Sequence, residues 1–211
     1  MEQTREWLRA ASSVAALSGA GISAESGIPT FRGAGGLWRQ FRPEELATPE
    51  AFARDPRRVG EWYEWRRKLI GAAQPNAGHL ALVELEKKKP QFTLITQNVD
   101  GLHERAGSRK VLELHGDIWI SRCTGCGRER RDEGRPPEEL PPRCECGGLL
   151  RRGIVWFGEA LPGGVWREAE QATRSAEVFL VIGTSEETLL SGQLDRSLRD
   201  LAGELLPQLI T

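Results

Sequence analysis

A glycine-rich turn directly after a short apolar run constrains the fold of this chain more than any other feature. The run from Val14 to Leu17 is long enough for one buried strand, and it ends where the glycines begin. Gly19, Gly21 and Ala24 fit the spacing G-x-G-x-x-G/A, in which small residues let the backbone approach a pyrophosphate at a helix N-terminus. The pattern predicts an α/β fold that binds a dinucleotide. Three small residues in a glycine-rich chain also fit an ordinary tight turn.

The acidic residue that usually follows such a turn by about 20 positions is not clear in this chain. Glu44 and Glu45 lie near that distance, but they follow Pro43 and do not end an apolar strand. We therefore expect the ribose contact to differ from that of the usual Rossmann fold.

The composition excludes some classes of function. The chain has 211 residues with 29 basic and 30 acidic side chains, so it lacks the basic excess that nucleic-acid binding requires. No apolar run approaches the ~20 residues that span a bilayer, and the polar N-terminus does not resemble a signal peptide. We expect no nucleic-acid or membrane partner and a cytoplasmic location. The oligomeric state is not predicted.

All four cysteines lie in one cluster, as Cys123-x-x-Cys126 and Cys144-x-Cys146 on either side of residues 127–143. Four thiolates in two close pairs supply the closed tetrahedral shell that is typical of one structural zinc ion. An iron–sulfur cluster and two disulfides are the alternatives for such a set. Because so small a ribbon buries little core, we expect zinc to stabilise its fold.

Polar side chains follow the strand predicted at 92–96, namely Gln97, Asn98 and Asp100. Ligands of open α/β sheets bind at the carboxyl ends of the strands, which makes these residues candidates for cofactor contacts. Asn98 and Asp100 could instead cap the next helix.

The chain has three histidines, and they lie in different contexts. His79 and His103 lie on predicted helices, whereas His115 follows a strand predicted at 111–114 and precedes a glycine. Histidine can exchange a proton near neutral pH. A lone histidine is more often structural than catalytic, and His115 has the context that favours catalysis.

Tyr63 and Arg66 lie three residues apart on a helix predicted at 57–71, so they project from the same face. From spacing alone, a surface tyrosine beside one of several arginines is the simpler interpretation.

Longer motifs follow one another along the chain: GAGISAESGIPTFRG, TQNVDGLHERAG, LHGD, VWFGEALP and GTS. Together with the four cysteines, they resemble the sirtuin family of NAD-dependent protein lysine deacylases, from about residue 14 to 185. The resemblance implies a doubly wound, mostly parallel α/β sheet of the Rossmann type with a smaller module made of a zinc ribbon and helices. The implied division is a NAD-binding domain at 1–32, 76–118 and 153–211, a cofactor loop and helical module at 33–75, and a zinc ribbon at 119–152.

The resemblance also assigns roles to residues, with His115 as the general base. The implied NAD contacts are Gly19, Ala20, Gly21, Ile22, Phe31, Arg32, Gln97, Asn98, Asp100, Gly183, Thr184 and Ser185. The implied contacts with the acyl-lysine peptide are Val155, Trp156, Phe157 and Gly158.

The Tyr-x-x-Arg pair resembles the class III branch of the family, which accepts malonyl and succinyl lysine, and Thr30 also fits that branch. There the phenol and the guanidinium, here Tyr63 and Arg66, bind the free carboxylate of the acyl chain. We therefore expect activity on succinyl or malonyl lysine of proteins, in addition to acetyl lysine.

In the implied reaction, the acyl oxygen attacks the ribose carbon that bears nicotinamide, and the products are nicotinamide, O-acyl-ADP-ribose and free lysine. Mono-ADP-ribosyl transfer uses the same cleavage with another acceptor and is the alternative activity. A catalytically impaired NAD-binding or peptide-binding module is the third interpretation.

The family pattern breaks after Ser185. Sirtuins continue there through a helix and a strand that ends in an asparagine, whereas Glu186 and its neighbours resemble the residues just after that asparagine. We infer that a helix and a strand, roughly 25 residues by ordinary element lengths, are absent between Ser185 and Glu186. An intact mass above 23.4 kDa would show that the natural protein carries them, and a matching mass would show a real deletion that damages the adenosine site.

Overall fold

The computed structural model of the chain describes residues 1–32, 35–132, 137–184 and 201–210. Its helices are α1 (Glu2–Ala10), α2 (Ala20–Ala24), the 3-10 helix η1 (Leu37–Arg39), α3 (Pro43–Leu46), α4 (Pro49–Arg54), α5 (Pro56–Ala72), α6 (Ala77–Lys88), α7 (Leu102–Ala106), α8 (Gly163–Ser175) and α9 (Ala202–Ile210). Its strands are β1 (Ser13–Ser18), β2 (Gln91–Thr96), β3 (Val111–Glu113), β4 (Gly116–Cys123), β5 (Glu129–Arg131), β6 (Leu150–Ile154) and β7 (Val178–Ile182). Within the described residues, no helix has the length and apolar character needed to cross a membrane.

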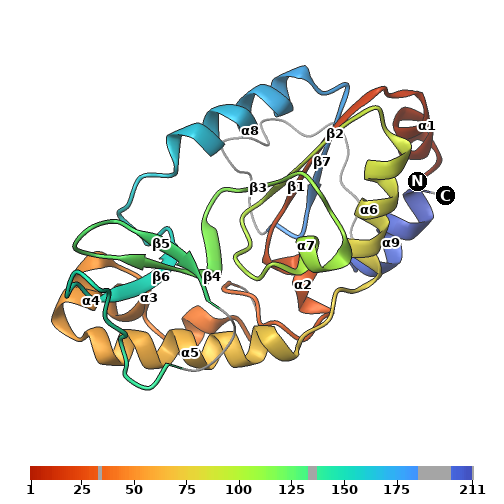
Figure 1. The fold of residues 1–211 in the computed structure, drawn as a ribbon. Helices are drawn as coiled ribbons and strands as arrows, with labels where there is room; N and C mark the ends of the chain where they lie inside the picture. The colour runs from red at the N-terminus through yellow and green to blue at the C-terminus, as the bar shows by residue number, and fades with distance from the viewer. Residues whose placement is uncertain (33–34, 133–136, 185–200, 211) are drawn as a thin grey trace.

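The larger sheet has four parallel strands in the order β3-β2-β1-β7 (Figure 1). The chain proceeds from β1 through β2 to β3 on one side, and β7 then pairs with the other edge of β1. The predicted doubly wound parallel sheet is therefore confirmed. Its topological switch point lies between β1 and β7, which is where open α/β sheets bind their ligands.

Helices cover both faces of this sheet because its apolar side chains point alternately to each face. Ala16 and Leu94 pack with α1, α6 and α9, whereas their neighbours Leu17 and Ile95 pack with α8. All four side chains are completely buried. Figure 1 shows α8 on one side of the sheet and α6 with α9 on the other.

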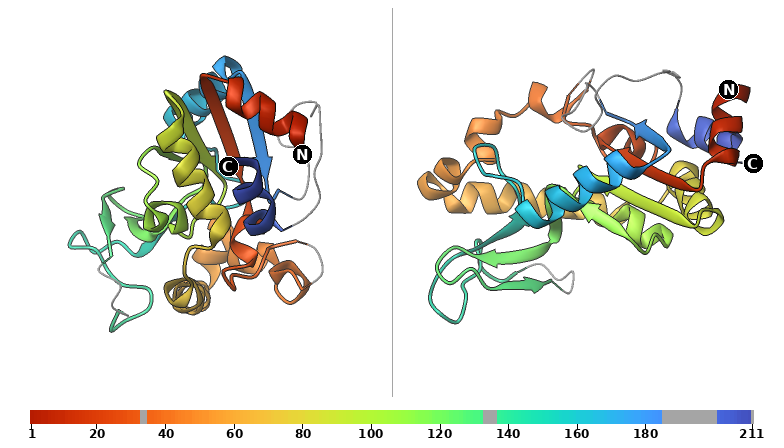
Figure 2. Two further views of the ribbon diagram at one scale, coloured as in Figure 1. Left: turned by 90° about the vertical axis from the view of Figure 1, so that its right-hand side faces the viewer. Right: turned by 90° about the horizontal axis from the view of Figure 1, so that it is seen from above.

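The first and last helices lie side by side (Figures 1 and 2), and Arg5 Nε donates a hydrogen bond to Gln208 O at 3.0 Å. Helix α1 ends at Ala10 because Ala11 has an extended backbone that leads into β1. In the tail that follows Ser185, the structure has α9 from Ala202, and 185–200 lie outside the described residues.

A second sheet, antiparallel with the order β5-β4-β6, forms the cysteine ribbon. Strand β4 begins at Gly116 and β6 ends at Ile154. The predicted domain boundaries near 118 and 152 therefore fall inside paired strands, and the division into domains remains a prediction.

Helix α5 carries Tyr63 and Arg66 and is fixed to the ribbon by a buried cluster of four charges. Glu64 of α5 forms an ion pair with Arg152, and Arg67 of α5 forms one with Asp132. Arg152 also forms an ion pair with Asp132. The buried charges are balanced, so removing one partner would leave another uncompensated. The cluster thus sets the position of α5 relative to β4 and β6.

Candidate active site and metal centre

The glycine turn after β1 packs backbone to backbone against the turn after β7, at the switch point of the sheet. Gly21 N donates to Gly183 O at 2.8 Å, and Gly183 has a φ of +65°. A Cβ atom on Gly21 would lie 2.7 Å from Gly183 Cα, which is closer than real Cβ contacts allow. Both positions therefore require glycine, and bare backbone forms the floor of the site.

A cavity of about 640 Å³ extends over this floor, a volume in the range of small-molecule sites. The predicted cofactor residues that line it are Gly19, Ala20, Gly21, Phe31, Arg32, Gln97, Asn98, Gly183 and Thr184. Ile22 does not line it, because that side chain is completely buried in the core beneath the turn. Ser185 lies outside the described residues.

A polar network behind the cavity wall positions Asn98. Asn98 Nδ2 donates to Ser23 Oγ at 3.1 Å and to Gly19 O at 3.2 Å. Ser23 Oγ donates to Asp100 Oδ2 at 2.8 Å, and Asp100 Oδ1 accepts the Leu102 amide at 2.9 Å. Burial raises the pKa of Asp100, and the bonds from Leu102 and Ser23 act in the opposite direction. Asp100 thus lies behind Asn98 at the start of α7, and its contact with the cofactor remains a prediction.

Two buried histidines lie near the same turn but do not line the cavity. The ring centroids of His79 and His103 are 4.9 Å apart, and His103 Nε2 lies 2.8 Å from Ser18 Oγ. Burial lowers the pKa of His79 to about 4 and that of His103 to about 3. Both imidazoles are therefore neutral at pH 7, as expected for structural residues.

His115 follows β3 and lines the cavity. Its Nδ1 atom lies 2.9 Å from Gln97 O, so Nδ1 carries the proton and Nε2 keeps a lone pair. Burial lowers the pKa of His115, whereas the bond to Gln97 raises it. The imidazole is neutral near pH 7, and Nε2 can act as a base.

Tyr63 and Arg66 reach the same cavity from α5 and are only 2% and 5% exposed, which excludes the surface interpretation. The guanidinium carbon of Arg66 lies 4.6 Å from the ring centroid of Phe31 and 5.3 Å from that of Trp62. Burial lowers the pKa of Arg66, and Tyr63 and Asp100 act in the opposite direction. Within the described residues, no carboxylate forms an ion pair with this guanidinium.

The predicted peptide-binding segment, 155–158, also lines the cavity. Val155 N donates to His115 O and Phe157 N donates to Ala47 O, each at 2.9 Å. Because these amides already have acceptors, a peptide strand added here would bond to carbonyl oxygens of the segment or displace Ala47. Pairing with the peptide remains a prediction.

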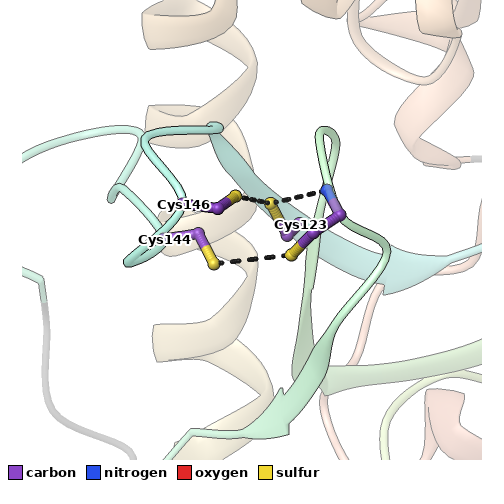
Figure 3. A group of neighbouring side chains, drawn as sticks. Cys123, Cys144 and Cys146 are labelled. Atoms are coloured by element: carbon purple, nitrogen blue, oxygen red, sulfur yellow. Dashed lines mark hydrogen bonds between the residues drawn. The ribbon is translucent and has the colours of Figure 1, made fainter.

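The four cysteine thiols meet between the turn after β4 and the loop before β6. Figure 3 shows Cys123, Cys144 and Cys146 of this group. Their sulfur atoms lie within 4.8 Å of one another, with Cys123 Sγ 3.4 Å from Cys146 Sγ, and none is in a disulfide. Zinc–sulfur bonds of about 2.3 Å place tetrahedral ligands about 3.8 Å apart, so the set fits zinc. The amides of Cys126 and Gly125 donate to Cys123 Sγ and lower the pKa of that thiol to about 6, which favours the thiolate.

Other residues of the cavity wall were assigned no contact with cofactor or substrate from the sequence: Thr30, Trp38, Ala47, Trp62, Val99, Ile154, Glu159 and Leu161. Glu159 could have been found, because it belongs to the same motif as the peptide-binding segment. Trp38 and Ala47 carry no signal, since only the folded path of the loop before α4 brings them to the cavity.

The fold and the site define an α/β protein with a dinucleotide site at the switch point of its sheet and a metal-binding ribbon. The Sir2 family model matches residues 19–189, and the chain belongs to this family. A relative from Aquifex aeolicus named NAD-dependent protein deacylase is 62% identical over 173 residues, which are 82% of this chain and 72% of the relative. A Sir2 homologue solved with ADP-ribose is 44% identical, with a TM-score of 0.94 over 100% of this chain and 95% of the other. A Sir2 homologue solved with NAD has the same identity and a TM-score of 0.91, over 100% and 92% of the two chains.

A deacylase from Leptospira interrogans is 46% identical over 226 aligned positions, which cover 93% of this chain and 91% of the relative. That alignment is longer than the 211 residues of this chain. The relative therefore has residues inside the matched region that this chain lacks, in agreement with the predicted missing segment. The predicted place of the gap, between Ser185 and Glu186, lies outside the described residues.

Proposed function

We propose that this chain is an NAD-dependent protein lysine deacylase, which transfers the acyl group of a modified lysine to ADP-ribose. A single observation carries this proposal: a neutral histidine with a free Nε2 lines the same cavity as a bare-backbone floor and a buried cation. The names of the relatives from Aquifex aeolicus and Pyrobaculum aerophilum, both NAD-dependent protein deacylases, support it.

The cavity floor fits NAD. Without Cβ atoms at Gly19, Gly21 and Gly183, the backbone can approach a pyrophosphate closely. NAD supplies the ribose carbon to which the acyl oxygen becomes attached when nicotinamide leaves. The ring of Phe31 in the cavity wall would help to exclude water from that sugar.

His115 is the proposed general base, which accepts a proton from a ribose hydroxyl at Nε2. The carbonyl oxygen of Gln97 holds the productive tautomer and stabilises the imidazolium that forms. Asn98, itself held by Ser23, would position the nicotinamide ribose.

We also propose a preference for acyl groups that end in a carboxylate. A buried cation without a counter-ion costs several kcal/mol, and Arg66 has no carboxylate ion pair within the part of the chain that the structure describes. Its cavity is therefore matched to an anion. Malonyl and succinyl chains provide such an anion, and the guanidinium can bind both carboxylate oxygens at once.

The zinc ion is proposed to be structural, because four thiolates leave no open position for a substrate.

Cysteines outside disulfides are typical of a reducing compartment, which supports the cytoplasm as the location.

The test is mass spectrometry of reactions that contain NAD and one lysine peptide in acetylated or succinylated form. We expect nicotinamide, O-acyl-ADP-ribose and free peptide in equal amounts, with faster turnover of the succinyl peptide. Labelled ADP-ribose on protein without acyl-ADP-ribose would indicate mono-ADP-ribosyl transfer instead. Absence of nicotinamide release with every acyl peptide would indicate a binding module.

A further inference from the structure

A buried hydrogen bond joins the two sides of the proposed acyl pocket. Trp156 Nε1 donates to the phenol oxygen of Tyr63 at 2.8 Å, and these side chains are 3% and 2% exposed. The two residues are 93 positions apart, one after β6 and the other on α5. Within the described residues, this is the only hydrogen bond of the Tyr63 side chain.

This bond determines the direction in which the phenol can act. An indole N–H can only donate, so the oxygen of Tyr63 accepts, and the phenol proton is left for another partner. Burial raises the pKa of Tyr63, so the phenol remains protonated at neutral pH. Tyr63 lines the cavity, where a ligand can accept this proton.

Contacts on several sides hold the indole of Trp156 in this orientation. The guanidinium carbon of Arg151 lies 3.7 Å from the centroid of the indole. The Glu159 carboxylate accepts hydrogen bonds from the Arg151 side chain and from the backbone amide of Trp156. The ring of Phe52 packs at 5.4 Å between centroids. The indole therefore cannot turn away from the phenol without losing its cation–π contact with Arg151 and its packed contact with Phe52.

We propose that Trp156 is a specificity-determining positioning residue, which makes Tyr63 a hydrogen-bond donor toward the acyl chain and thereby favours acyl groups that end in a carboxylate. Arg66 in the same cavity is also a donor only. Two donors at the acyl end match an anion and give nothing to a methyl group. This inference rests on the proposed function, because it assigns the acyl end to this part of the cavity.

The test is the dissociation constant, measured by calorimetry without NAD, of one lysine peptide in its succinyl and acetyl forms. Trp156→Phe keeps an aromatic ring and removes the N–H. We expect the succinyl peptide to lose about 5-fold to 20-fold more affinity than the acetyl peptide. In a Tyr63→Phe background, the same change should alter the ratio of the two constants by less than about 2-fold. Trp166→Phe on α8 is the matched control, and the ratio should not change there.

Equal weakening of both peptides by Trp156→Phe would overturn the inference, because it would indicate a purely structural role. The inference would also be overturned if Trp156→Phe reduced the preference for the succinyl peptide as much in the Tyr63→Phe background as in the wild type. It would be overturned as well if the wild-type chain did not prefer the succinyl peptide. Binding does not require turnover. A chain with the expected preference but no nicotinamide release would therefore refute the proposed activity and support the inference.

A second measurement needs no change at Trp156. In ¹⁵N-labelled protein, the indole N–H of Trp156 should exchange slowly with solvent, and it should exchange faster in Tyr63→Phe. Equal exchange in the two proteins would contradict the hydrogen bond on which the inference depends.

Discussion

His115 can act as a base only while its imidazole is neutral, which makes the rate depend on pH. Because burial lowers the pKa of His115 below its usual 6.5, the acidic inflection of kcat/KM should lie below pH 6.5. Initial rates of nicotinamide release would measure this profile.

His115→Gln is the control for this profile. Loss of a general base typically lowers the rate by ~10² to 10⁴-fold, and the acidic inflection should disappear with it. An inflection that persists in the variant would show that another group accepts the proton.

Arg66 should affect acidic acyl groups selectively. Arg66→Met removes charge-assisted hydrogen bonds worth about 1.5–3 kcal/mol, so kcat/KM should fall about 10-fold to 100-fold for succinyl lysine and less than about 2-fold for acetyl lysine. Competition between the two peptides, read by mass spectrometry, measures the ratio. Arg66→Lys keeps the charge without the planar fork and should give an intermediate loss, whereas equal losses on both substrates would reject the assignment.

At the scale of elements, the outer part of the ribbon depends on its metal because it buries little surface. All three residues of β5 are exposed, and the four cysteine sulfurs lie together between the two ribbon loops. Removal of zinc by a chelator should therefore expose the amides of β5 and of the two cysteine loops to exchange while β1 and β2 stay protected. Hydrogen exchange read by mass spectrometry would show this, and added zinc should restore protection. A ribbon that stays protected without metal would contradict a structural role for zinc.

The elements themselves could be predicted closely where local patterns are strong. The strand predicted at 92–96 differs by one residue from β2, which begins at Gln91, and the strand predicted at 111–114 differs by one residue from β3, which ends at Glu113. Helix α5 begins at Pro56, directly after Asp55, whose side chain accepts the Arg58 amide at 3.0 Å. It begins one residue before the predicted 57, because proline fits the first turn of a helix.

For the whole molecule, the buried histidines make folding sensitive to acid. The pKa of His79 is about 4 and that of His103 about 3 in the folded state, against 6.5 in the unfolded state. Because the folded state keeps these histidines neutral, their full contribution to the free energy of unfolding is present above pH 6.5 and is lost as the pH falls toward the folded-state pKa values. Between pH 6.5 and 5, each histidine should lower the free energy of unfolding by about 2 kcal/mol.

Glu113 acts in the opposite sense, because burial and the nearby Asp117 and Glu104 raise its pKa to about 7. A variant must therefore be compared with the wild type at each pH. In urea unfolding, the wild type should lose about 2 kcal/mol more than His103→Gln between pH 7.5 and 5. Equal losses in the two proteins would show that His103 does not titrate on unfolding.

Local patterns in the sequence were sufficient for the fold class, the cysteine ligands and the identity of the base candidate. Glycine spacing, apolar periodicity and paired cysteines act over a few residues, so they can be recognised in a linear chain. The sequence could not show that Gly21 lies in the cavity floor whereas Ile22 lies in the core. This difference depends on which face the backbone presents after β1 is paired.

Only the tertiary structure decided the contacts between distant segments. It packs Gly21 against Gly183, places Asp100 behind Asn98, and brings the indole of Trp156 to the phenol of Tyr63. These contacts arise from strand order and from the packing of α5 against the ribbon. Neither is encoded in the neighbouring residues, because the free energy that selects them comes from the core as a whole.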